Sequence, residues 1–470
     1  MKNEELCFMP ATEMAAAIRE KRLSPVEAVD AILDRIEEIN PRINAYVTLA
    51  AEAARTAARA AEDALAKGKA PGLLHGVPVS LKDLTYTRGI RTTFGSKLYE
   101  NFVPDEDCAL VEKLKAAGAI ILGKTNTPEF GIIANTDNPV FGPSRNPWNL
   151  NRTPGGSSGG AAAAAAAGLG PLHSGNDGGG SIRIPGSFCG VYGLKPQFGR
   201  VARQPAIHGW ETLAHEGPLT RTVADAALML SAMAGPDNRD RLSLPAQKID
   251  FINATRGDVK GLKAAWSPDL GYAAVDPEVR AITAKAARQF ENLGCEVEEI
   301  SADFPNTEAD WLVIVISEIA AALEERREEW EKVMYPYYRG FIPMADTLTA
   351  KDLAMAQFQR EELWAKIHRI FETYDFLLTP TTPITAFDIE TPLGPTEIDG
   401  QDIAPTGVAC FTLPFNFTGQ PAATVPCGFT GEGLPVGLQI VGRRYDEATV
   451  IRASAAFERA CPWADKKPLL

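Results

Sequence analysis

The chain has 470 residues, of which 45% are hydrophobic and 23% are charged, a composition typical of a globular protein with a large core. Its formal net charge is −13 and no basic block occurs, which argues against a nucleic-acid partner and against an anionic-membrane partner. Seven widely spaced cysteines without a Cys-x-x-Cys pair, and five histidines without ligand spacing, argue against a disulfide framework and against a metal site.

The N-terminal part predicts helices. Its first residues, MKNEELCFMPATEM, contain no apolar signal core, and the chain has no apolar run of about 18 residues, so we expect a cytoplasmic protein. Ser24-Pro25-Val26-Glu27 has the pattern of a helix start, and this helix is expected to stop before Pro41. A second helix is predicted from Ala50 to Lys67, with Gly68 as its stop.

A buried strand is predicted at the end of the apolar run 73–81, and Lys82 and Asp83 follow it directly. A helix over 107–117 and a strand over 119–122 come next. Gly118 to Thr125 matches the phosphate-loop pattern, but the intervening residues Ala-Ile-Ile-Leu form a strand and no helix follows. We therefore reject a nucleotide site at this position.

The stretch from Gly155 to Ser181 organises the chain. A long proline-rich loop over 129–154 leads into it, and loops of this length are often functional. The stretch then reads GGSSGG, seven alanines, and a second glycine cluster that ends at Ser181. The first cluster predicts a sharp entry into an alanine-rich helix, and the second provides backbone N–H groups next to a hydroxyl, as in an oxyanion hole. Because the flanking residues are suited to packing, we reject a flexible linker.

The rest of the chain alternates helices with apolar strands. Short strands and turns are expected from Ser181 to about Gly217, and a helix capped by Thr222 should end near Gly235. One further helix is predicted from Asp276 to Gly294 and another from Asp446 to Ala460. Between them, 309–375 is predicted to form two long helices separated by YPYYRGFIPM. Further strands are predicted at LKAAW, CEVEEI, FLLTP, PAATVPCGF and GLPVGLQIVG. This alternation predicts an α/β class with a covered sheet.

Lys82, Ser157 and Ser181 are the candidate catalytic residues. Burial at the end of an apolar strand would neutralise Lys82 and make it a usable general base for a serine nucleophile. Two arrangements remain open. Gly155–Gly159 matches the nucleophile elbow Gly-x-Ser-x-Gly, which would make Ser157 the nucleophile with a later histidine, such as His368. Alternatively, Ser181 attacks, the amides of Gly178, Gly179, Gly180 and Ser181 bind the oxyanion, and Ser157 relays a proton to Lys82.

Several blocks of the sequence resemble the amidase signature family. They are GVPVSLKDL, NPWNLNRTPGGSSGGAAAAAAAG, GNDGGGSIRIPGSFCGVYGLKP, GPLTRTVADAALML, LLTPTTPITAF and LPFNFTGQPAATVP with GLPVGLQIVG, and the separations between Lys82, Ser157 and Ser181 also agree. The resemblance covers nearly the whole chain and is weakest between about 236 and 370. It implies one amidase-signature fold, a large mixed twisted β-sheet covered by helices on both faces.

The resemblance also implies a Ser–cis-Ser–Lys triad in which Ser181 is the nucleophile, Ser157 the bridging serine after a cis Gly156–Ser157 bond, and Lys82 the base. It implies that Ser158 supports this network and that Asp177 and Arg183 brace the nucleophile loop. It places Gly131, Ile132 and Ile133 in the substrate pocket, with Trp311, Ile314, Ile316, Tyr335 and Tyr337 as further lining candidates. Two departures from the family pattern are Gly178, where threonine is usual, and Asn176 before the aspartate.

We therefore expect an amidase for small apolar or aryl amides that forms a seryl acyl-enzyme, needs no metal or organic cofactor, and also suits aryl esters or carbamates. The alternatives are the glutaminase subunit of a tRNA-dependent amidotransferase, an α/β-hydrolase-type esterase that uses Ser157 and a histidine, and a non-catalytic binding protein. Members of the glutaminase branch usually carry glutamine at the position of Ile184. We expect a single domain, 1–470, made of N-terminal helices (1–70), a signature core (71–235), a variable helical region (236–370) and the C-terminal part of the core (371–470). A homodimer is one assembly that the sequence allows.

Overall fold

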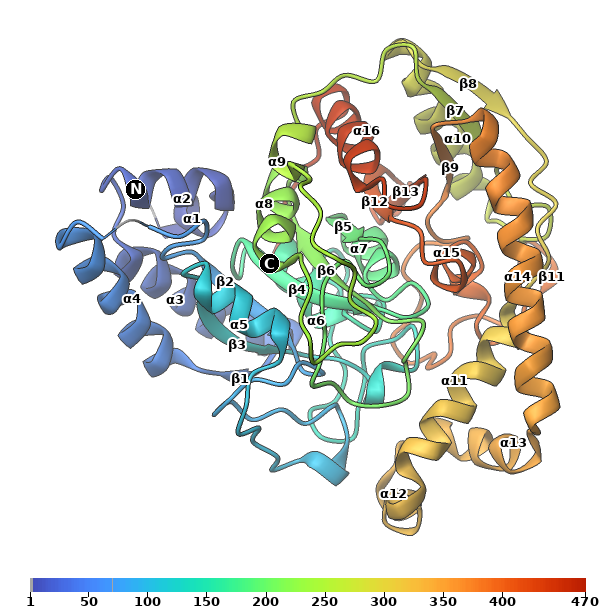
Figure 1. Cartoon of the computed structure of the whole chain (residues 1–470), viewed down its shortest axis with the longest axis horizontal. Helices are drawn as coiled ribbons and strands as arrows, with labels where there is room; N and C mark the ends of the chain where they lie inside the picture. The colour runs from blue at the N-terminus through green and yellow to red at the C-terminus, as the bar shows by residue number, and fades with distance from the viewer. Residues whose placement is uncertain (1–2, 70) are drawn as a thin grey trace.

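The computed structural model describes residues 3–69 and 71–470. Its strands are β1 Tyr46–Leu49, β2 Pro78–Lys82, β3 Ile120–Thr125, β4 Leu172–Asp177, β5 Tyr192–Lys195, β6 His215–Thr220, β7 Lys263–Trp266, β8 Glu296–Glu299, β9 Phe376–Pro380, β10 Glu397–Ile398, β11 Gln401–Asp402, β12 Ala422–Phe429 and β13 Pro435–Gly442. All except the small β10–β11 hairpin belong to one 11-stranded sheet, in the order β1-β3-β2-β4-β6-β5-β12-β13-β9-β7-β8 (Figure 1). Strands from both halves of the sequence therefore share one sheet.

The sheet is mixed, and its parallel part determines where the chemistry lies. Strand β2 pairs in parallel with both β3 and β4, whereas β4 pairs antiparallel with β6. The carboxyl ends of parallel strands meet at one edge of a sheet, which is where ligand sites of open α/β sheets form. Lys82, the last residue of β2, and Asp177, the last residue of β4, therefore lie at the same edge.

Helices cover both faces of this sheet. They are α1 Asn3–Cys7, α2 Ala11–Arg19, α3 Pro25–Ile43, α4 Ala51–Ala66, α5 Ala109–Ala116, α6 Gly159–Ala166, α7 Arg183–Cys189, α8 Val223–Met233, α9 Phe251–Ala254, α10 Pro277–Asn292, α11 Glu308–Leu323, α12 Arg327–Val333, α13 Phe341–Thr347, α14 Ala350–Thr373, α15 Leu413–Phe417 and α16 Glu447–Ala460. Short 3₁₀ turns occur at η1 Lys97–Tyr99, η2 Glu129–Gly131, η3 Glu324–Arg326, η4 Pro336–Gly340 and η5 Gly407–Ala409.

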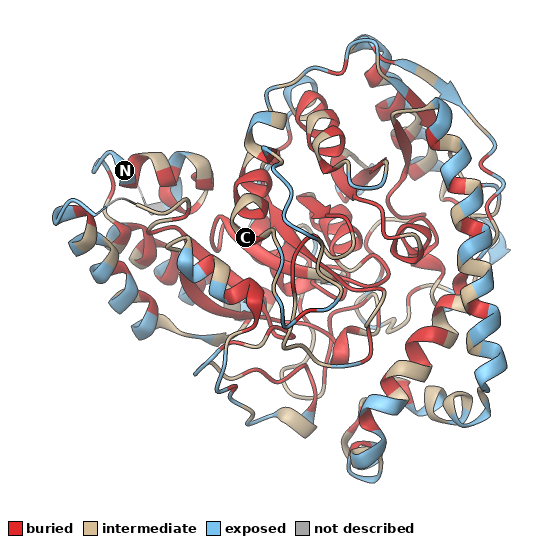
Figure 2. Ribbon diagram, viewed as in Figure 1, coloured by how far each residue is buried: buried red, intermediate tan, exposed pale blue. Residues whose placement is uncertain are grey.

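The alanine-rich helix α6 lies at the centre of the molecule. It packs against strands β1, β2, β3, β4 and β6 and against helix α7, and every one of its residues is buried. Helix α8 packs against β4, β5 and β6, and against α16. The burial colours of Figure 2 show the same layering, with buried central strands and helices and an exposed outer side on the peripheral helices. A helix without large side chains fits this place because it allows the strands and loops around it to approach closely.

Helices α11 to α14 form an arm along one side of the sheet region (Figure 1). Helix α11 packs against α12, α13, α14 and α15, and its apolar side buries Trp311, Ile314 and Val315. The arm falls mostly within the variable helical region of the sequence, and its residues Trp311 and Phe341 line the same cavity as Ser181. It therefore supplies part of the wall of the site described below.

Most predicted elements are present, but three predictions were wrong. Helix α3 does not stop before Pro41: it continues to Ile43 and ends at Asn44, whose left-handed backbone caps it. Pro41 has no N–H to donate, so the last turn loses one helical hydrogen bond, while α3 is held along its length by a row of buried residues. The segment after Ser181 was expected to hold only strands and turns, and instead it begins with the buried helix α7.

The third wrong prediction concerns 309–375. The first of the two predicted long helices is broken by the 3₁₀ turn η3 into α11 and α12, and the segment between the predicted helices is itself helical, as η4 and α13. Elements that the sequence analysis did not place are helices α1, α2, α9 and α15, strands β1 and β4, and the β10–β11 hairpin. The division into domain parts stays a prediction.

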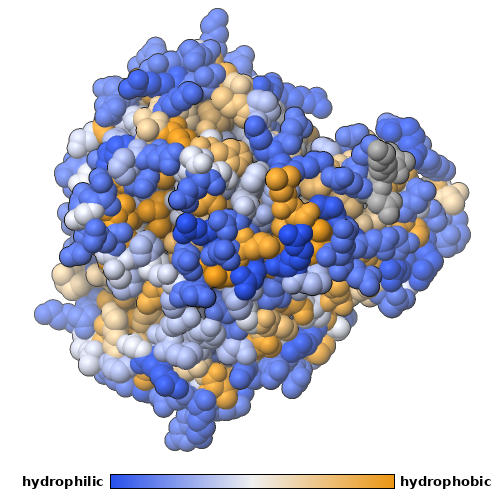
Figure 3. Space-filling view, turned by 180° about the vertical axis from the view of Figure 1, so that it is seen from behind, coloured by the Kyte–Doolittle hydropathy of each residue, from blue (hydrophilic) through white to orange (hydrophobic). Residues whose placement is uncertain are grey.

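The surface of the molecule is largely hydrophilic. Seen from behind, hydrophobic residues are interspersed among hydrophilic ones (Figure 3). Within residues 3–69 and 71–470, none of the helices combines the length and the apolar character that a membrane crossing requires.

Candidate active site

Lys82 is buried at the end of β2, in a strand whose five residues are all buried. Its Nζ donates hydrogen bonds of 2.6 Å to Ser157 Oγ and 2.6 Å to Asn176 Oδ1. Burial lowers the pKa of Lys82 to about 7, against the opposing effect of the Glu216 and Asp177 carboxylates. Near neutral pH a substantial fraction of this amine is therefore unprotonated, which is the form that a general base requires.

Ser157 and Ser158 lie at the entry to α6. The peptide bond Gly156–Ser157 is cis, as the family resemblance implied. Ser158 donates from its backbone N–H to Ser181 O (3.1 Å) and from its hydroxyl to Asn176 O (3.2 Å). Ser158 therefore ties the segment that carries Ser157 to the segment that carries Ser181.

The close approach of α6 to its neighbours requires glycine. A Cβ on Gly160 would lie 2.4 Å from Asn126 N and 2.7 Å from Ala45 O, distances that no side chain tolerates. Glycine at this point lets the first turn of α6 pack directly on the backbone that follows β3. The second glycine pair of GGSSGG is thus a packing requirement rather than a flexible connection.

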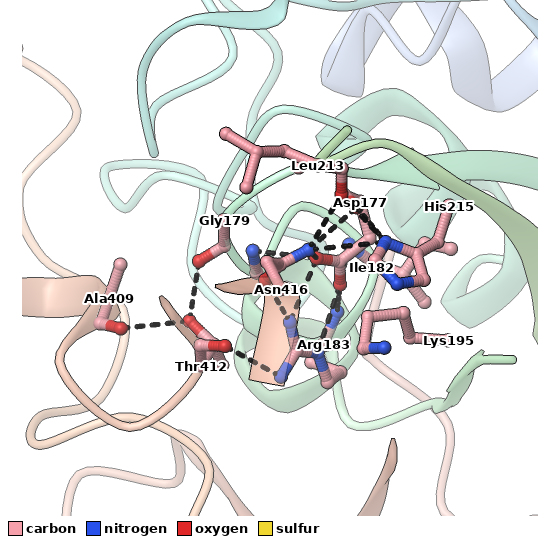
Figure 4. Close-up of polar contacts among 12 residues, drawn as sticks. Asp177, Gly179, Ile182, Arg183, Lys195, Leu213, His215, Ala409, Thr412 and Asn416 are labelled. Carbon is pink, nitrogen blue, oxygen red and sulfur yellow. Dashed lines mark hydrogen bonds and ion pairs between the residues drawn. The ribbon is translucent and has the colours of Figure 1, made fainter. Parts of the chain in front are cut away.

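Asp177 organises the loop that carries Ser181 (Figure 4). Its carboxylate accepts hydrogen bonds from the amides of Gly180 (2.7 Å) and Ile182 (3.1 Å), and it forms a fully buried ion pair with Arg183 at 2.9 Å. Burial alone would raise the pKa of Asp177, but the Arg183 guanidinium outweighs burial, so the pKa lies below its ordinary value. The loop therefore turns around a permanently ionised carboxylate.

Arg183 anchors this loop to the C-terminal part of the chain. Its guanidinium donates to Asn416 Oδ1 (2.6 Å), Gln439 Oε1 (2.8 Å) and Thr412 O (3.0 Å). Asn416 in turn donates to the backbone oxygen of Asp177 at 2.8 Å. Asp177 and Arg183 thus connect the loop to the C-terminal part of the chain, and their partners on α15 and β13 are residues that the sequence analysis did not identify.

The amide groups of the predicted oxyanion hole are not equivalent. The Gly180 N–H already donates to Asp177, so this member of the predicted set is engaged and does not point at a ligand. The carbonyls of Gly178 and Gly179 accept hydrogen bonds from Trp311 Nε1 (2.9 Å) and Thr412 Oγ1 (2.7 Å), which hold these two peptide units in place. The predicted donors that remain are the amides of Gly178, Gly179 and Ser181.

Ser181 lies in the wall of a cavity of about 380 Å³, a size suited to a small organic ligand. Gly131, Ile132 and Ile133, the predicted pocket residues, all line it. Of the further candidates Trp311 lines it as well, whereas Ile316 lines a small neighbouring pocket and Tyr335 donates its hydroxyl to Asp137. Ile314, Tyr335 and Tyr337 are absent from the cavity wall.

The rest of the cavity wall escaped the sequence analysis. It includes Ile184, Trp210, Asn306, Glu308, Phe341, Thr406 and Leu413. Most of these side chains are apolar, and Glu308 is the one charged residue that the described lining contains. These residues come from segments far apart in the sequence, so no local pattern pointed to them.

Trp210 occupies the space next to Gly178. A Cβ on Gly178 would lie 2.5 Å from Trp210 Cε3, so the indole fills the volume that a threonine side chain would take. The room that glycine leaves at this position is therefore filled by an indole, which itself lines the cavity.

The five histidines have other roles than pairing with a serine nucleophile. His75 contacts Ala61, His173 contacts Ser80 and Gly170, and His208 contacts Glu211. His215 contacts Asp177 and Leu213, and His368 contacts Glu372. The Ser157 hydroxyl is paired with a lysine instead. In the part of the chain that the structure describes, no three His, Cys, Asp or Glu side chains are grouped so as to hold a metal ion.

Comparison with known proteins adds to this geometry. Residues 27–451 match the family model described as Amidase. The chain is 42% identical to an acylamidase of Rhodococcus erythropolis over 473 residues, covering 100% of this chain and 98% of the relative. It is 39% identical to a glutamyl-tRNA(Gln) amidotransferase subunit of Moorella thermoacetica, covering 99% of each chain.

Solved structures point the same way. A bacterial aryl acylamidase of the amidase signature family superposes with a TM-score of 0.93 at 34% identity, covering 98% of this chain and 99% of that one. This protein therefore belongs to the amidase signature family and is a hydrolase that acts on carbon–nitrogen bonds.

Proposed function

We propose that the chain is a serine amidase that hydrolyses small apolar or aryl amides through an acyl-enzyme on Ser181, and that aryl esters and carbamates are further substrates. The observation that carries the proposal is the 2.6 Å contact between Lys82 Nζ and Ser157 Oγ, made by a fully buried lysine whose pKa lies at about 7. Such a pair is suited to take a proton from a nearby serine. Ser181, linked to Ser158 through the backbone, is the serine that opens on the cavity.

In the proposed reaction Ser181 Oγ attacks the amide carbonyl, and its proton passes through the Ser157 hydroxyl to Lys82 Nζ. The negative charge that forms on the carbonyl oxygen is held by amides of the Gly178–Ser181 loop. Collapse of this intermediate breaks the C–N bond, and Lys82 returns the proton through Ser157 to the leaving nitrogen. A water molecule then attacks the acyl-enzyme by the same relay, which releases the acid and restores Ser181.

The substrate class follows from the cavity wall. Ile132, Ile133, Ile184, Trp210 and Leu413 give it a mainly apolar character, which suits an alkyl or aryl group on either side of the amide. Relatives named as an acylamidase and an aryl acylamidase support the same class.

A glutaminase subunit is the second candidate, because relatives named as amidotransferase subunits are nearly as similar. The residue that argues against it is Ile184, which stands in the cavity wall at the position where that branch usually carries glutamine. An apolar side chain there offers no hydrogen bond to a polar amino-acid substrate. A cytoplasmic location, a single domain and a homodimeric assembly complete the proposal and rest on the sequence alone.

Two measurements test the proposal. A panel of anilides, carbamates and glutamine, followed by amine or ammonia release, should give turnover with the anilides; deamidation of glutamine as the sole activity would overturn the substrate class. A serine-directed sulfonyl fluoride should label Ser181, mapped by peptide mass spectrometry, and Ser181→Ala should lose the label. Labelling of Ser157 in place of Ser181 would overturn the mechanism.

A further inference from the structure

Near Lys82 lies a carboxylate, that of Glu216, to which the proposed reaction gives no role. Asn176 on β4 and Glu216 on β6 are directly opposite each other in the antiparallel register of these strands. Residues paired in this way project from the same face of a sheet, with Cβ atoms about 4.5–5.5 Å apart. Because Asn176 Oδ1 accepts a 2.6 Å hydrogen bond from Lys82 Nζ, the Glu216 side chain lies on the face of the sheet that holds the lysine amine.

Glu216 is nearly buried and incompletely paired. Its side chain is only 8% exposed, and its Oε2 is buried without a hydrogen-bond partner within residues 3–69 and 71–470. It lines a small cavity of about 10 Å³ together with Asn176, Arg203 and Trp210. Arg203 contributes a second orphaned atom, its buried Nε, which likewise has no partner among the described residues. A buried carboxylate held without a direct ion pair is costly, so it calls for an explanation beyond packing.

The charged and titratable groups around Glu216 come from several elements. Burial raises the pKa of Glu216 to about 7, against the lowering effect of Arg203 and Lys82, while Asp240 raises it further. Cys108, at the start of α5, also faces it. Lys82 itself is faced by Glu216 and Asp177, which favour its charged form. Of the two carboxylates that face Lys82, Asp177 forms an ion pair with Arg183. Glu216 forms no ion pair with an arginine among the described residues.

We propose that Glu216 is a positioning residue that supplies the counter-charge for Lys82 each time the amine takes up a proton, while Asn176 fixes the direction of the ammonium group. The inference rests on the proposed function, in which Lys82 alternates between amine and ammonium. A fully buried ammonium without a compensating charge is strongly disfavoured. Glu216 offsets this cost and thereby keeps the lysine basic enough to accept the serine proton.

The test is the pH profile of anilide hydrolysis by Glu216→Gln. Loss of the negative charge should move the acid limb of kcat/KM to lower pH by about half a unit or more, because an ammonium without its counter-charge loses its proton more easily. The plateau should fall in kcat with little change in KM, because Glu216 is not part of the wall of the substrate cavity. Glu216→Asp, which keeps the charge, should retain the limb near its wild-type position.

Glu211→Gln is the matched control, since it removes the same charge five residues earlier, at a glutamate that contacts His208 on the surface. An acid limb in Glu216→Gln that coincides with that of Glu211→Gln would overturn the inference. If Glu216→Gln does not fold, Glu216→Ala with added formate replaces it: formate should restore kcat and the limb, and failure of formate to do so overturns the inference. Activity retained in Lys82→Ala would remove the proposed base and this inference together, whereas an inactive Lys82→Ala with an unshifted Glu216→Gln limb removes the inference alone.

Discussion

At the scale of single residues, the protonation of Lys82 controls the proposed chemistry. Its pKa of about 7 is set by burial, and the amine acts as a base only when unprotonated. We therefore expect kcat/KM to rise with pH through about 7 and to level off above it. A pH-rate profile for an anilide measures this, and a profile that is flat across this range would contradict the assignment.

Removal of the amine should cost far more than removal of other lysines. Lys82→Ala is expected to lower kcat by about 10²-fold or more, because general-base catalysis contributes on that scale. Lys97→Ala removes a lysine at the exposed start of η1 and serves as the control. Equal kcat values for the two variants would remove Lys82 from the mechanism.

The contact between Gly178 and Trp210 makes a third prediction. A methyl group at position 178 would lie 2.5 Å from the indole, so Gly178→Ala should displace Trp210, reduce kcat/KM and lower the melting temperature. The smaller ring in Trp210→Phe should restore part of the loss when the two changes are combined. Gly340→Ala is the control, because a Cβ there meets no atom within 4 Å.

The result of the combined variant decides between packing and backbone freedom. If Trp210→Phe gives no recovery, the glycine is required for the conformation of the loop and not for space. Recovery in thermal stability without recovery in kcat/KM would place the defect in the indole's contribution to the cavity wall.

The candidate catalytic residues could be singled out from the sequence because each lies in a local pattern. Lys82 follows an apolar strand, and Ser157 and Ser181 stand in glycine clusters whose spacing is visible in one dimension. Asn176, Trp210 and Glu308 were not recognised as contacts of the site, because their partners are distant in sequence and nothing in their surroundings marks them. Trp210, for example, reaches Gly178 only because the segment after β5 folds back over the nucleophile loop.

At the scale of elements, helix α7 shows where local reasoning fails. Its sequence, RIPGSFC, contains proline and glycine, which disfavour helix formation in isolation. It forms because Asp177 binds Arg183 at its start and because the whole helix is buried against β5, β12 and β13. A Cβ on Gly186 would lie 2.6 Å from Thr424 Cγ2, so this glycine is demanded by tertiary packing. Contacts with residues more than 200 positions away in the sequence thus stabilise this seven-residue helix.

Glu129 links the arm formed by α11 to α14 to the segment Gly131–Ile133, which lines the cavity. Its carboxylate accepts from Ser96 Oγ (2.6 Å), Trp330 Nε1 (3.1 Å) and Tyr335 N (2.9 Å), and burial raises its pKa despite these bonds. In Glu129→Gln an NH₂ group, which only donates, replaces one of the two acceptor oxygens. The glutamine side chain therefore cannot accept hydrogen bonds from all three donors. We expect faster hydrogen exchange in 327–340 and a higher KM, since Gly131 to Ile133 line the cavity two residues further on.

Hydrogen-exchange mass spectrometry measures this effect. Glu328→Gln is the matched control, because it removes an exposed carboxylate from α12, the helix that carries Trp330. Unchanged exchange in 327–340 together with a wild-type KM would show that the arm is held by its apolar contacts alone.

The carboxylate of Glu308, in the first turn of α11, is expected to affect how well the enzyme discriminates between substrates of different charge. It is the one charged side chain in the described cavity wall. Wild type should therefore disfavour an anionic anilide relative to a neutral one, and Glu308→Gln should reduce that discrimination by about 5-fold or more. The ratio of the two kcat/KM values measures it, and a ratio that is the same in both enzymes would contradict the prediction.

At the scale of the whole molecule, the shared sheet means that buried titratable groups on its central strands report on global unfolding. His173 lies on β4, fully buried between β2 and β6, and its ring nitrogens contact Ser80 Oγ at 2.7 Å and Gly170 O at 2.9 Å. Burial lowers the pKa of His173 to about 3. Because β4 is paired on both sides, the ring stays buried and neutral above this pKa for as long as the sheet is intact.

The lowered pKa of His173 determines whether the free energy of unfolding rises or falls as the pH decreases. Between the ordinary histidine pKa of about 6.5 and the folded value, the unfolded chain binds a proton that the folded chain refuses, so stability falls as pH decreases. One such group contributes a slope of about 1.4 kcal/mol per pH unit inside this window. Urea denaturation between about pH 6.5 and about pH 4.5 should give a shallower dependence of the unfolding free energy in His173→Gln than in wild type. His368→Gln, which alters an exposed histidine, should keep the wild-type slope; equal slopes in all three proteins would mean that other groups on the molecule set its acid limit.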